Sequence, residues 1–233
     1  MKAEAIAHVK EIVSDWAYMK NLPQEMQNFH LQILKKDYDD IYDLYRYVDE
    51  KSHCSATAYY HAETDEYKLR VQIGSFEFCL KECIAPRIED FQNILDTQFE
   101  DILRRIMDFE TEKIGMLFKE KQILEWDFSS LLPEHLENFE LFIRPSKPLH
   151  ITNGSYVILD YENFSYKSNF VVYYNIFRDE FFSDARIAGL PDINYEFDSQ
   201  TLEELKTKLS LHLNERLKII REQSETEIAR QSP

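Results

Sequence analysis

The sequence predicts an α+β protein, a tandem duplication of a helix–antiparallel sheet–helix unit. Three observations support this prediction: an internal repeat, apolar residues at helical spacing at both ends of each copy, and short runs rich in tyrosine, phenylalanine and β-branched residues between them. The first α+β repeat spans residues 1–110 and the second spans residues 111–233. Each copy, at about 115 residues, has a common domain size.

The repeat is anchored by the only two tryptophans, Trp16 and Trp126, which lie 110 residues apart. In this register both copies contain Leu-Pro, four variable residues and then Asn-Phe-x-Leu-x-Ile. The second copy gains four residues near 144–151, after which a register of 114 aligns the Asp-Glu pair at 65–66 with the pair at 179–180. Chance does not readily align all of these features with one short gap, so we interpret them as a duplication.

Each copy is expected to open with an amphipathic helix. Its apolar residues recur at three- and four-residue spacing: Ile6, Val9, Ile12, Val13 and Trp16 in the first copy, and Ile114, Leu117, Phe118 and Leu124 in the second. The Leu-Pro step should end this helix, because proline disfavours the α conformation in the residue before it.

Four main strands are expected to follow in each copy. Their ranges are 29–34, 41–48, 56–62 and 67–73, then 139–143, 156–161, 169–177 and 181–188. Each Asp-Glu pair falls between two strand-like runs, which predicts a hairpin turn. Helices near 87–110 and 201–223 should close the copies, the second with a capping box that begins at Thr201, and a helical connector should lead from 87–110 into the second copy.

The composition argues against several functional classes. The chain carries 27 Lys+Arg and 43 Asp+Glu, a formal charge of −16, which disfavours direct binding to nucleic acid. Its four glycines stand apart from one another, so no glycine-rich phosphate loop is expected. No signal peptide or membrane-spanning run is visible, and three cysteines do not suggest a disulfide framework, so we expect a cytoplasmic protein.

The residues that could bind a metal or act in catalysis are better explained by packing and turn formation. Cys79 and Cys83, with His53, Cys54 and His61 upstream, could form a zinc site. In the second copy, Ile193 and Phe197 occupy the positions that match Cys79 and Cys83. This favours thiols packed in small apolar sites, so we expect no metal and no cofactor. The Asp-Glu pairs could act as general acid and base, but a solvated turn explains them, and the sequence shows no catalytic arrangement, so we expect no enzyme.

Residues 37–50 are acidic and aromatic, with six carboxylates, four tyrosines and one arginine. The candidate partner-binding residues are Asp37, Asp39, Asp40, Tyr42, Asp43, Tyr45, Asp49 and Glu50. Carboxylates can steer a basic partner and tyrosines can supply contact area. The alternative is an ordinary strand with acidic residues outside and tyrosines inside.

Part of the second copy resembles HicB-like antitoxins. The resemblance covers about residues 170–220 and rests on Asp179-Glu180-Phe181-Phe182, on Gly189-Leu190-Pro191-Asp192 and on the Thr-Leu-Glu-Glu start at 201. It implies a hairpin, an apolar strand that ends in Leu-Pro, and a module that neutralises a small, basic, RNA-cutting toxin. The segment 191–201 lacks the family's customary glycine, and no DNA-binding tail is expected after about residue 223.

The sequence therefore predicts a non-enzymatic acidic binding protein of the antitoxin, immunity or inhibitor kind. Its partner would be a basic protein, such as a toxin or a nucleic-acid-processing enzyme, engaged through the acidic tyrosine-rich surface. The alternative is a small-molecule-binding or catalytic domain with a pocket between the two repeats. Self-association through the apolar closing helices is a third option. Neither direct nucleic-acid binding nor membrane binding is expected.

Overall fold

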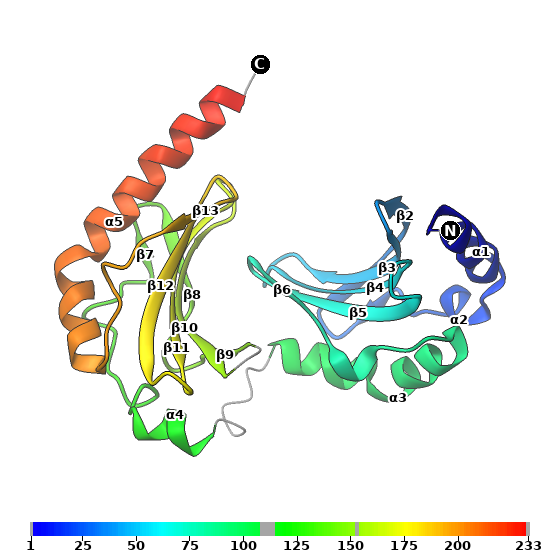
Figure 1. Ribbon diagram of the computed structural model, residues 1–233, viewed down its shortest axis with the longest axis horizontal. Helices are drawn as coiled ribbons and strands as arrows, with labels where there is room; N and C mark the ends of the chain where they lie inside the picture. Colours follow the sequence, from blue (N-terminus) through cyan, green and yellow to red (C-terminus); the bar gives the residue numbers. More distant parts are fainter. Residues whose placement is uncertain (1, 108–114, 152–153, 232–233) are drawn as a thin grey trace. The chain divides into compact units, whose positions relative to one another are not determined.

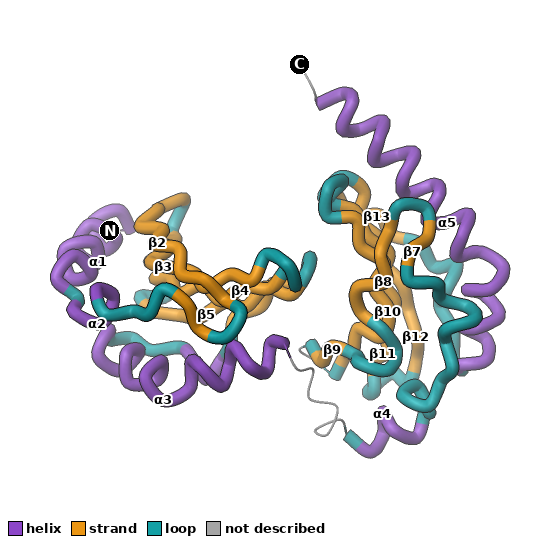
Figure 2. Tube along the Cα trace, turned by 180° about the vertical axis from the view of Figure 1, so that it is seen from behind, coloured by secondary structure: helices purple, strands orange, loops and turns teal. Residues whose placement is uncertain are grey.

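The computed structural model describes residues 2–107, 115–151 and 154–231. The chain divides into two compact units, Met1–Asp108 and Phe109–Pro233, which are called unit 1 and unit 2 below. Each unit combines helices with one antiparallel sheet, which confirms the α+β class (Figure 1). In both units the helices and the strands are segregated from one another (Figure 2). No helix of the described residues is long and apolar enough to cross a membrane.

Unit 1 contains a six-stranded antiparallel meander, in which each strand pairs with the next one along the chain. Its strands are β1 (Glu25–Met26), β2 (Phe29–Tyr38), β3 (Ile41–Asp49), β4 (Cys54–His61), β5 (Glu66–Ile73) and β6 (Phe76–Cys79). The four expected strands are confirmed to within a few residues at each end. The two short edge strands, β1 and β6, were not expected.

The helices of unit 1 follow the predicted apolar pattern. They are α1 (Lys2–Asp15), α2 (Ala17–Lys20), the 3₁₀ turn η1 (Lys81–Cys83) and α3 (Ile88–Met107). Helix α1 buries Ile6, Val9 and Val13. It ends before Trp16, whose backbone is extended (φ −64°, ψ 104°), so the Leu-Pro step follows the single turn of α2 and does not end α1 itself.

Helix α3 runs along the sheet of unit 1 and supplies much of its core (Figure 1). Its buried residues are Ile88, Phe91, Leu95, Phe99, Ile102, Leu103 and Ile106. The Phe99 ring lies 6.4 Å from the Tyr45 ring and 5.3 Å from the Tyr47 ring. Burying a side chain of this size stabilises the fold by roughly 2–3 kcal/mol.

Unit 2 contains a sheet of order β13-β12-β11-β10-β8-β7, with β9 paired to β10. Its strands are β7 (His135–Leu136), β8 (Phe139–Ile143), β9 (Leu149–His150), β10 (Ser155–Asn163), β11 (Ser168–Asn175), β12 (Glu180–Ile187) and β13 (Leu190–Ile193). The four expected strands are again confirmed, and the short strands β7, β9 and β13 were not expected.

The helices of unit 2 are α4 (Met116–Glu120) and α5 (Leu202–Gln231). The amide of Glu204 donates to Thr201 Oγ1 at 3.2 Å, as the capping box predicts, and α5 continues beyond the expected end at 223. The expected opening helix is wrong for the described residues, because α4 is only five residues long and Gln122 then adopts a left-handed conformation (φ 56°). Residues 108–114, which hold Ile114 and the expected connector, lie outside the described residues.

Tyrosine hydrogen bonds recur in both units at the register of the sequence repeat. The hydroxyl of Tyr47 donates to the carbonyl of Pro23 at 2.6 Å, and that of Tyr161 donates to the carbonyl of Pro133 at 2.6 Å. Each of these tyrosines is fully buried. The first bond joins β3 to the Leu-Pro step of unit 1, and the second joins β10 to the Leu-Pro step of unit 2. The Leu-Pro motif that the two units share in sequence therefore makes the same hydrogen bond in each.

Each of the two tryptophans contacts a residue near the start of the long helix of its own unit. Trp16 donates its indole hydrogen to Gln92 Oε1 at 2.8 Å, and the ammonium of Lys206 lies 5.6 Å from the centre of the Trp126 ring. Gln92 and Lys206 occupy equivalent positions, 114 residues apart, near the starts of α3 and α5. Each tryptophan is 8% exposed, as expected for an apolar anchor.

The Asp-Glu pairs lie at hairpin turns, as predicted. Asp65 and Asp179 both have φ 55°, a left-handed conformation that aspartate tolerates better than most residues. Their carboxylates accept hydrogen bonds from Tyr60 at 2.5 Å and from Tyr174 at 2.8 Å. The aspartate of each pair therefore belongs to the hairpin turn, and each glutamate is the first residue of the next strand.

We expect Tyr47→Phe and Tyr161→Phe each to lower the free energy of unfolding by about 1 kcal/mol, because each leaves a proline carbonyl without its buried donor. Urea denaturation of the two variants measures these changes. A loss in one variant and none in the other would contradict the equivalence of the two contacts.

Candidate functional site

Two of the eight candidate partner-binding residues are inside the core. Tyr42 is 3% exposed and Tyr45 is fully buried, with its ring packed against Phe99 of α3. The prediction that these tyrosines supply contact area to a partner is therefore wrong. The alternative, a strand with tyrosines inside, describes β3 better, because α3 covers the face to which Tyr45 points.

Asp43 is also structural. It is buried, and the guanidinium of Arg70 binds both of its carboxylate oxygens, at 2.9 and 2.7 Å. Arg70 also donates to the Tyr38 hydroxyl at 2.7 Å and lies over the Tyr59 ring. Burial raises the pKa of Asp43, and Arg70 offsets only part of that rise. The Asp43 carboxylate is thus engaged within the unit and is not offered to a partner.

Asp49 and Glu50 lie at the opposite end of β3 from Asp37, Asp39 and Asp40. Asp49 is 7% exposed and accepts hydrogen bonds from the amides of Lys51 and Ser52, at 3.1 and 3.4 Å, so it caps the turn between β3 and β4. Glu50 is exposed beside it. Nine residues of strand separate Asp40 from Asp49, a distance of about 30 Å. The eight candidates therefore do not form one continuous surface.

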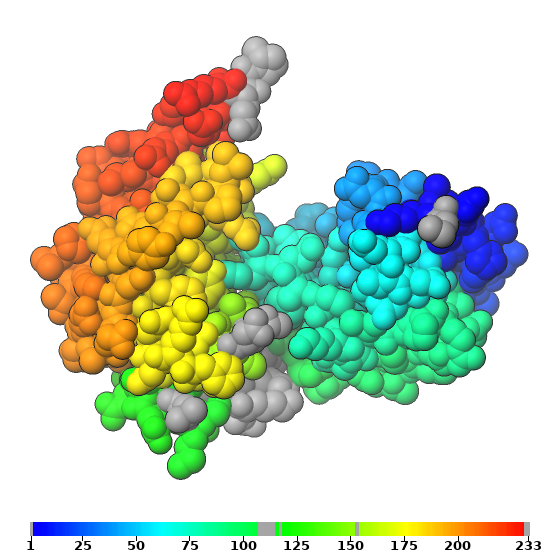
Figure 3. All heavy atoms as spheres, viewed as in Figure 1, coloured from blue at the N-terminus to red at the C-terminus, as the bar shows by residue number. Residues whose placement is uncertain are grey.

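The candidate site that remains is a group of carboxylates on two adjacent turns, β2–β3 and β4–β5, and at the end of β2 that leads into the first turn. We define the acidic end of unit 1 by these residues: Asp37, Asp39, Asp40, Glu63 and Asp65. The amide of Ala62 donates to the carbonyl of Asp40 at 2.7 Å and joins the two turns. In Figure 3 the dark blue atoms of α1 lie against the blue atoms at this end of the sheet.

Helix α1 supplies the lysines that pair with this acidic end. Lys10 lies 2.8 Å from Asp37, and Lys2 lies 3.4 Å from Asp40 and 3.6 Å from Glu63. The hydrogen bond from Lys10 lowers the pKa of Asp37. Burial opposes ionisation of Asp40, but its own backbone amide, Lys2 and His61 outweigh it and lower the pKa of Asp40. Asp37 and Asp40 are therefore ionised at neutral pH.

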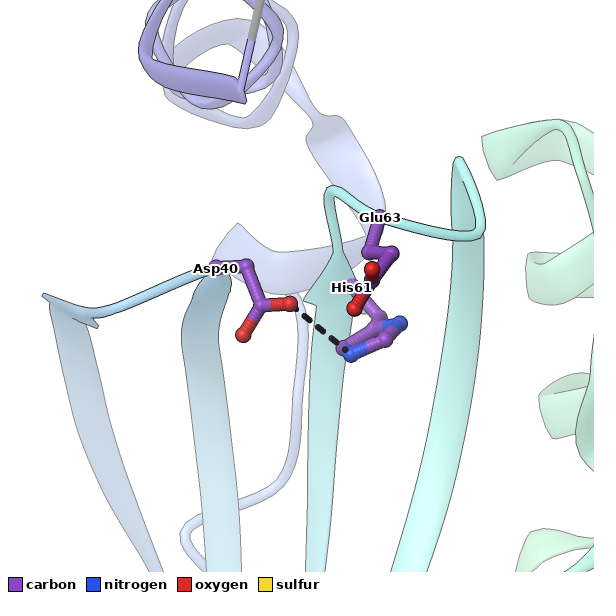
Figure 4. Close-up of side chains that lie close together, drawn as sticks. All are labelled: Asp40, His61 and Glu63. Atoms are coloured by element: carbon purple, nitrogen blue, oxygen red, sulfur yellow. Dashed lines mark ion pairs between the residues drawn. The ribbon is translucent and has the colours of Figure 1, made fainter.

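His61 completes a three-residue cluster with Asp40 and Glu63 (Figure 4). Its Nε2 lies 3.4 Å from Asp40 Oδ2, and its Nδ1 lies 3.0 Å from the hydroxyl of Thr64. One ligand atom from each of the three residues lies within 4.8 Å of the others. Sequence reasoning grouped His61 with the cysteines and missed this cluster. The spacing His61-x-Glu63 at a predicted hairpin was the available signal.

The three cysteines are not gathered around His61. Cys83 is fully buried, Cys54 is 5% exposed and Cys79 is half-buried. Burial raises the pKa of the Cys54 thiol to about 11 and that of the Cys83 thiol to about 12. Neutral thiols are poor nucleophiles and poor metal ligands, and this favours a packing role.

Unit 2 holds a buried pair of acids that sequence reasoning did not single out. Asp160 and Glu162 on β10 are 0% and 1% exposed, and the side-chain amide of Asn169 lies 3.3 and 3.4 Å from their carboxyl oxygens. Burial and the neighbouring Glu162 raise the pKa of Asp160 well above its usual range. Two acidic residues within the apolar run of β10 were the only signal in the sequence.

A groove of about 530 Å³ lies within unit 2 beside Trp126. Helix α5 contributes Leu202, Glu203 and Lys206 to its wall, and the segment after α4 contributes Lys121 and Gln122. The groove combines an aromatic ring with charged side chains of both signs.

Comparisons with protein-family models, with curated proteins and with solved structures found no match. The resemblance of residues 170–220 to HicB-like antitoxins remains a prediction. One detail differs from it, since Leu190 and Pro191 begin β13 and do not end the preceding strand. Function is therefore inferred below from the geometry and the charges of the described residues.

Proposed function

We propose that this chain is a non-enzymatic binding protein that engages a basic protein through the acidic end of unit 1. The observation that carries the proposal is the gathering of five carboxylates, four on two adjacent turns and Asp37 at the end of β2, beside which lie Lys2 and Lys10 of α1. Concentrated negative charge at an exposed site accelerates encounter with a basic partner and selects against acidic ones.

The charge of the whole chain supports the same role. Residues 1–108 hold 13 Lys+Arg and 21 Asp+Glu, and residues 109–233 hold 14 and 22, so each unit carries a formal charge of −8. Both units therefore attract a basic partner electrostatically, and the acidic end of unit 1 is the proposed binding site.

Lys2 indicates how a partner could bind. Its ammonium lies close to both Asp40 and Glu63, in the position that a lysine or arginine of a partner would take. A solvent-exposed ion pair of this kind contributes little to stability, and the Lys2 side chain is half-exposed, so its ammonium is easily displaced. An arginine, which can bind a carboxylate through two hydrogen bonds, would compete well.

The partner class that fits best is a toxin or another nucleic-acid-processing enzyme, because such proteins carry basic surfaces for phosphate groups. This makes the chain antitoxin-, immunity- or inhibitor-like, in line with the resemblance of residues 170–220 to HicB-like antitoxins. We place the protein in the cytoplasm, because its three cysteines are free thiols.

We also propose that both units descend from one duplicated module. The supporting observations are the paired Tyr47 and Tyr161 hydrogen bonds, the equivalent neighbours of the two tryptophans, and the matching sequence register. What both copies retain is packing and turn chemistry. A binding role for the acidic end therefore belongs to unit 1 alone.

Two variants of equal charge test the binding proposal. The first neutralises the acidic end with Asp37→Asn, Asp39→Asn, Asp40→Asn and Glu63→Gln. The control neutralises four exposed carboxylates elsewhere in unit 1: Glu25→Gln, Glu82→Gln, Glu89→Gln and Glu100→Gln. Each variant has a formal charge of −12 by the removal of four acids from a chain of −16. Circular dichroism confirms that both are folded.

The variants are used as bait in extracts of the native cells, at about 50 mM and about 500 mM salt, because screening weakens exposed ion pairs. The wild type and the control should retain the same basic proteins at low salt and release them at high salt, while the acidic-end variant should retain at least tenfold less. Equal retention by both variants, or no basic protein on the wild type, would overturn the proposal.

A small-molecule-binding role is the second candidate, and the groove beside Trp126 favours it. Trp16→Phe leaves Trp126 as the only tryptophan, so a ligand in the groove should change its fluorescence. Mass spectrometry of the purified protein under native conditions would detect a ligand that co-purifies. A ligand-dependent signal that is lost in Lys206→Ala would place the ligand in this groove.

A further inference from the structure

Asp40, His61 and Glu63 have the composition of a transition-metal site. Imidazole nitrogen and carboxylate oxygen together suit zinc and similar first-row divalent ions, whereas magnesium and calcium prefer oxygen ligands alone. Three protein ligands with a fourth position open to water is a common arrangement for zinc. Asp40 and Glu63 come from two turns that the Ala62–Asp40 backbone hydrogen bond holds side by side, and His61 is the last residue of β4.

One of the three ligand distances fits zinc as it stands, and the others lie within 4.8 Å. Zinc bonds of about 2.0–2.2 Å in a tetrahedron place neighbouring ligand atoms about 3.4 Å apart. His61 Nε2 and Asp40 Oδ2 already lie 3.4 Å apart. The Glu63 side chain, 63% exposed, has the freedom to bring its carboxylate to the third position (Figure 4).

The orientation of the imidazole ring is also suitable. Thr64 Oγ1 lies 3.0 Å from Nδ1 and can accept its hydrogen in the neutral ring with that tautomer, in which the Nε2 lone pair is available to a metal beside Asp40. Histidines that bind metals commonly donate their other ring hydrogen to an oxygen in this way, and the contact fixes both the tautomer and the ring.

A cation already occupies part of this cluster. The Lys2 ammonium lies 3.4 Å from Asp40 Oδ2 and 3.6 Å from Glu63 Oε2, two of the oxygens that would bind the metal. Its side chain is 54% exposed and can swing into solvent. Lys2 and a metal ion would therefore compete for the same carboxylates, and removal of Lys2 should favour the metal.

We propose that Asp40, His61 and Glu63 bind a zinc-class divalent ion in competition with the ammonium of Lys2. This goes beyond the proposed binding of a basic protein and does not require it. The competition distinguishes the proposal from nonspecific attraction of cations to an acidic surface, because neutralising one lysine next to the cluster should matter far more than neutralising one elsewhere.

Isothermal titration of the full chain with zinc chloride tests the proposal, with magnesium chloride as the comparison. We expect one zinc ion at this cluster and no comparable magnesium binding. His61→Gln should weaken zinc binding at least tenfold, whereas Lys2→Gln should tighten it several-fold. The matched controls are His8→Gln and Lys20→Gln, which alter an exposed histidine and an exposed lysine outside the cluster and should change little.

Titration with cobalt(II), followed by absorption, identifies the ligands independently. A tetrahedral cobalt spectrum that is lost in His61→Gln supports the site, whereas a thiolate charge-transfer band would place the metal on cysteine and overturn it. Unchanged zinc affinity in His61→Gln, or weaker binding in Lys2→Gln, would also overturn it. Circular dichroism of each variant excludes loss of folding as the cause, and none of these readouts depends on a protein partner.

Discussion

Arg70→Met is expected to lower the free energy of unfolding of unit 1 by about 3–5 kcal/mol, because it leaves the buried Asp43 carboxylate without its cation. The methionine keeps most of the apolar stem but none of the hydrogen bonds to Asp43 and Tyr38. Urea denaturation, followed by circular dichroism, measures the change.

The matched control for Arg70→Met is the double variant Asp43→Leu with Arg70→Met. Replacement of both members of a buried ion pair by apolar residues is often neutral, so the double variant should recover most of the lost stability. A double variant as unstable as Arg70→Met alone would show that the pair is not the cause. Recovery would establish that Asp43 serves the fold, in contrast to its predicted role in binding a partner.

Asp160→Asn is expected to stabilise the protein increasingly as the pH rises. Because the folded-state pKa of Asp160 is raised, the folded protein binds its proton more tightly than the unfolded chain does. The contribution of protonated Asp160 to the free energy of unfolding is therefore complete below the pKa of the unfolded carboxyl, near 3.8. This contribution is lost as the pH rises toward the folded-state pKa. The loss is about 1.4 kcal/mol for each pH unit within that window. Asparagine removes this titration.

Urea denaturation at several pH values from about 4 to about 8 tests the Asp160 prediction. The wild type should lose stability across this range more steeply than Asp160→Asn does. Asp39→Asn, at an exposed turn, serves as the control and should follow the wild type. Parallel curves for wild type and Asp160→Asn would contradict the prediction and would show that the acid is not held protonated.

Much of the fold could be predicted because it depends on local periodicity. The buried stripe of α3 and the alternation of β5 are visible in the residue order alone, since a helix repeats every 3.6 residues and a strand every two. The hairpin turns at Asp65 and Asp179 were predictable for a similar reason, as turn residues act on their own backbone. The opening helix of unit 2 failed because spacing does not reveal a left-handed residue such as Gln122.

The candidate site was predictable only in part. An acidic run at 37–50 is plain in the sequence, but the run extends over a turn and a whole strand, so its members lie at two ends and in the core. His61 and Glu63 join Asp40 only through the pairing of β3 with β4, which brings Ile41 opposite His61. No local pattern around Asp40 identifies a partner more than twenty residues away.

The sequence by itself determined the class of fold, most of the strands and the excess of negative charge, because these follow from composition and from short-range periodicity. Only the tertiary structure decided which carboxylates are exposed to solvent. Asp39 and Asp43 are the same residue type four positions apart, yet Asp39 is exposed at a turn and Asp43 is buried against Arg70. The physical reason is that burial and neighbouring charges decide whether a carboxylate is paired within the fold or exposed to solvent. Strand pairing places Arg70, 27 residues further along the chain, beside Asp43 and not beside Asp39.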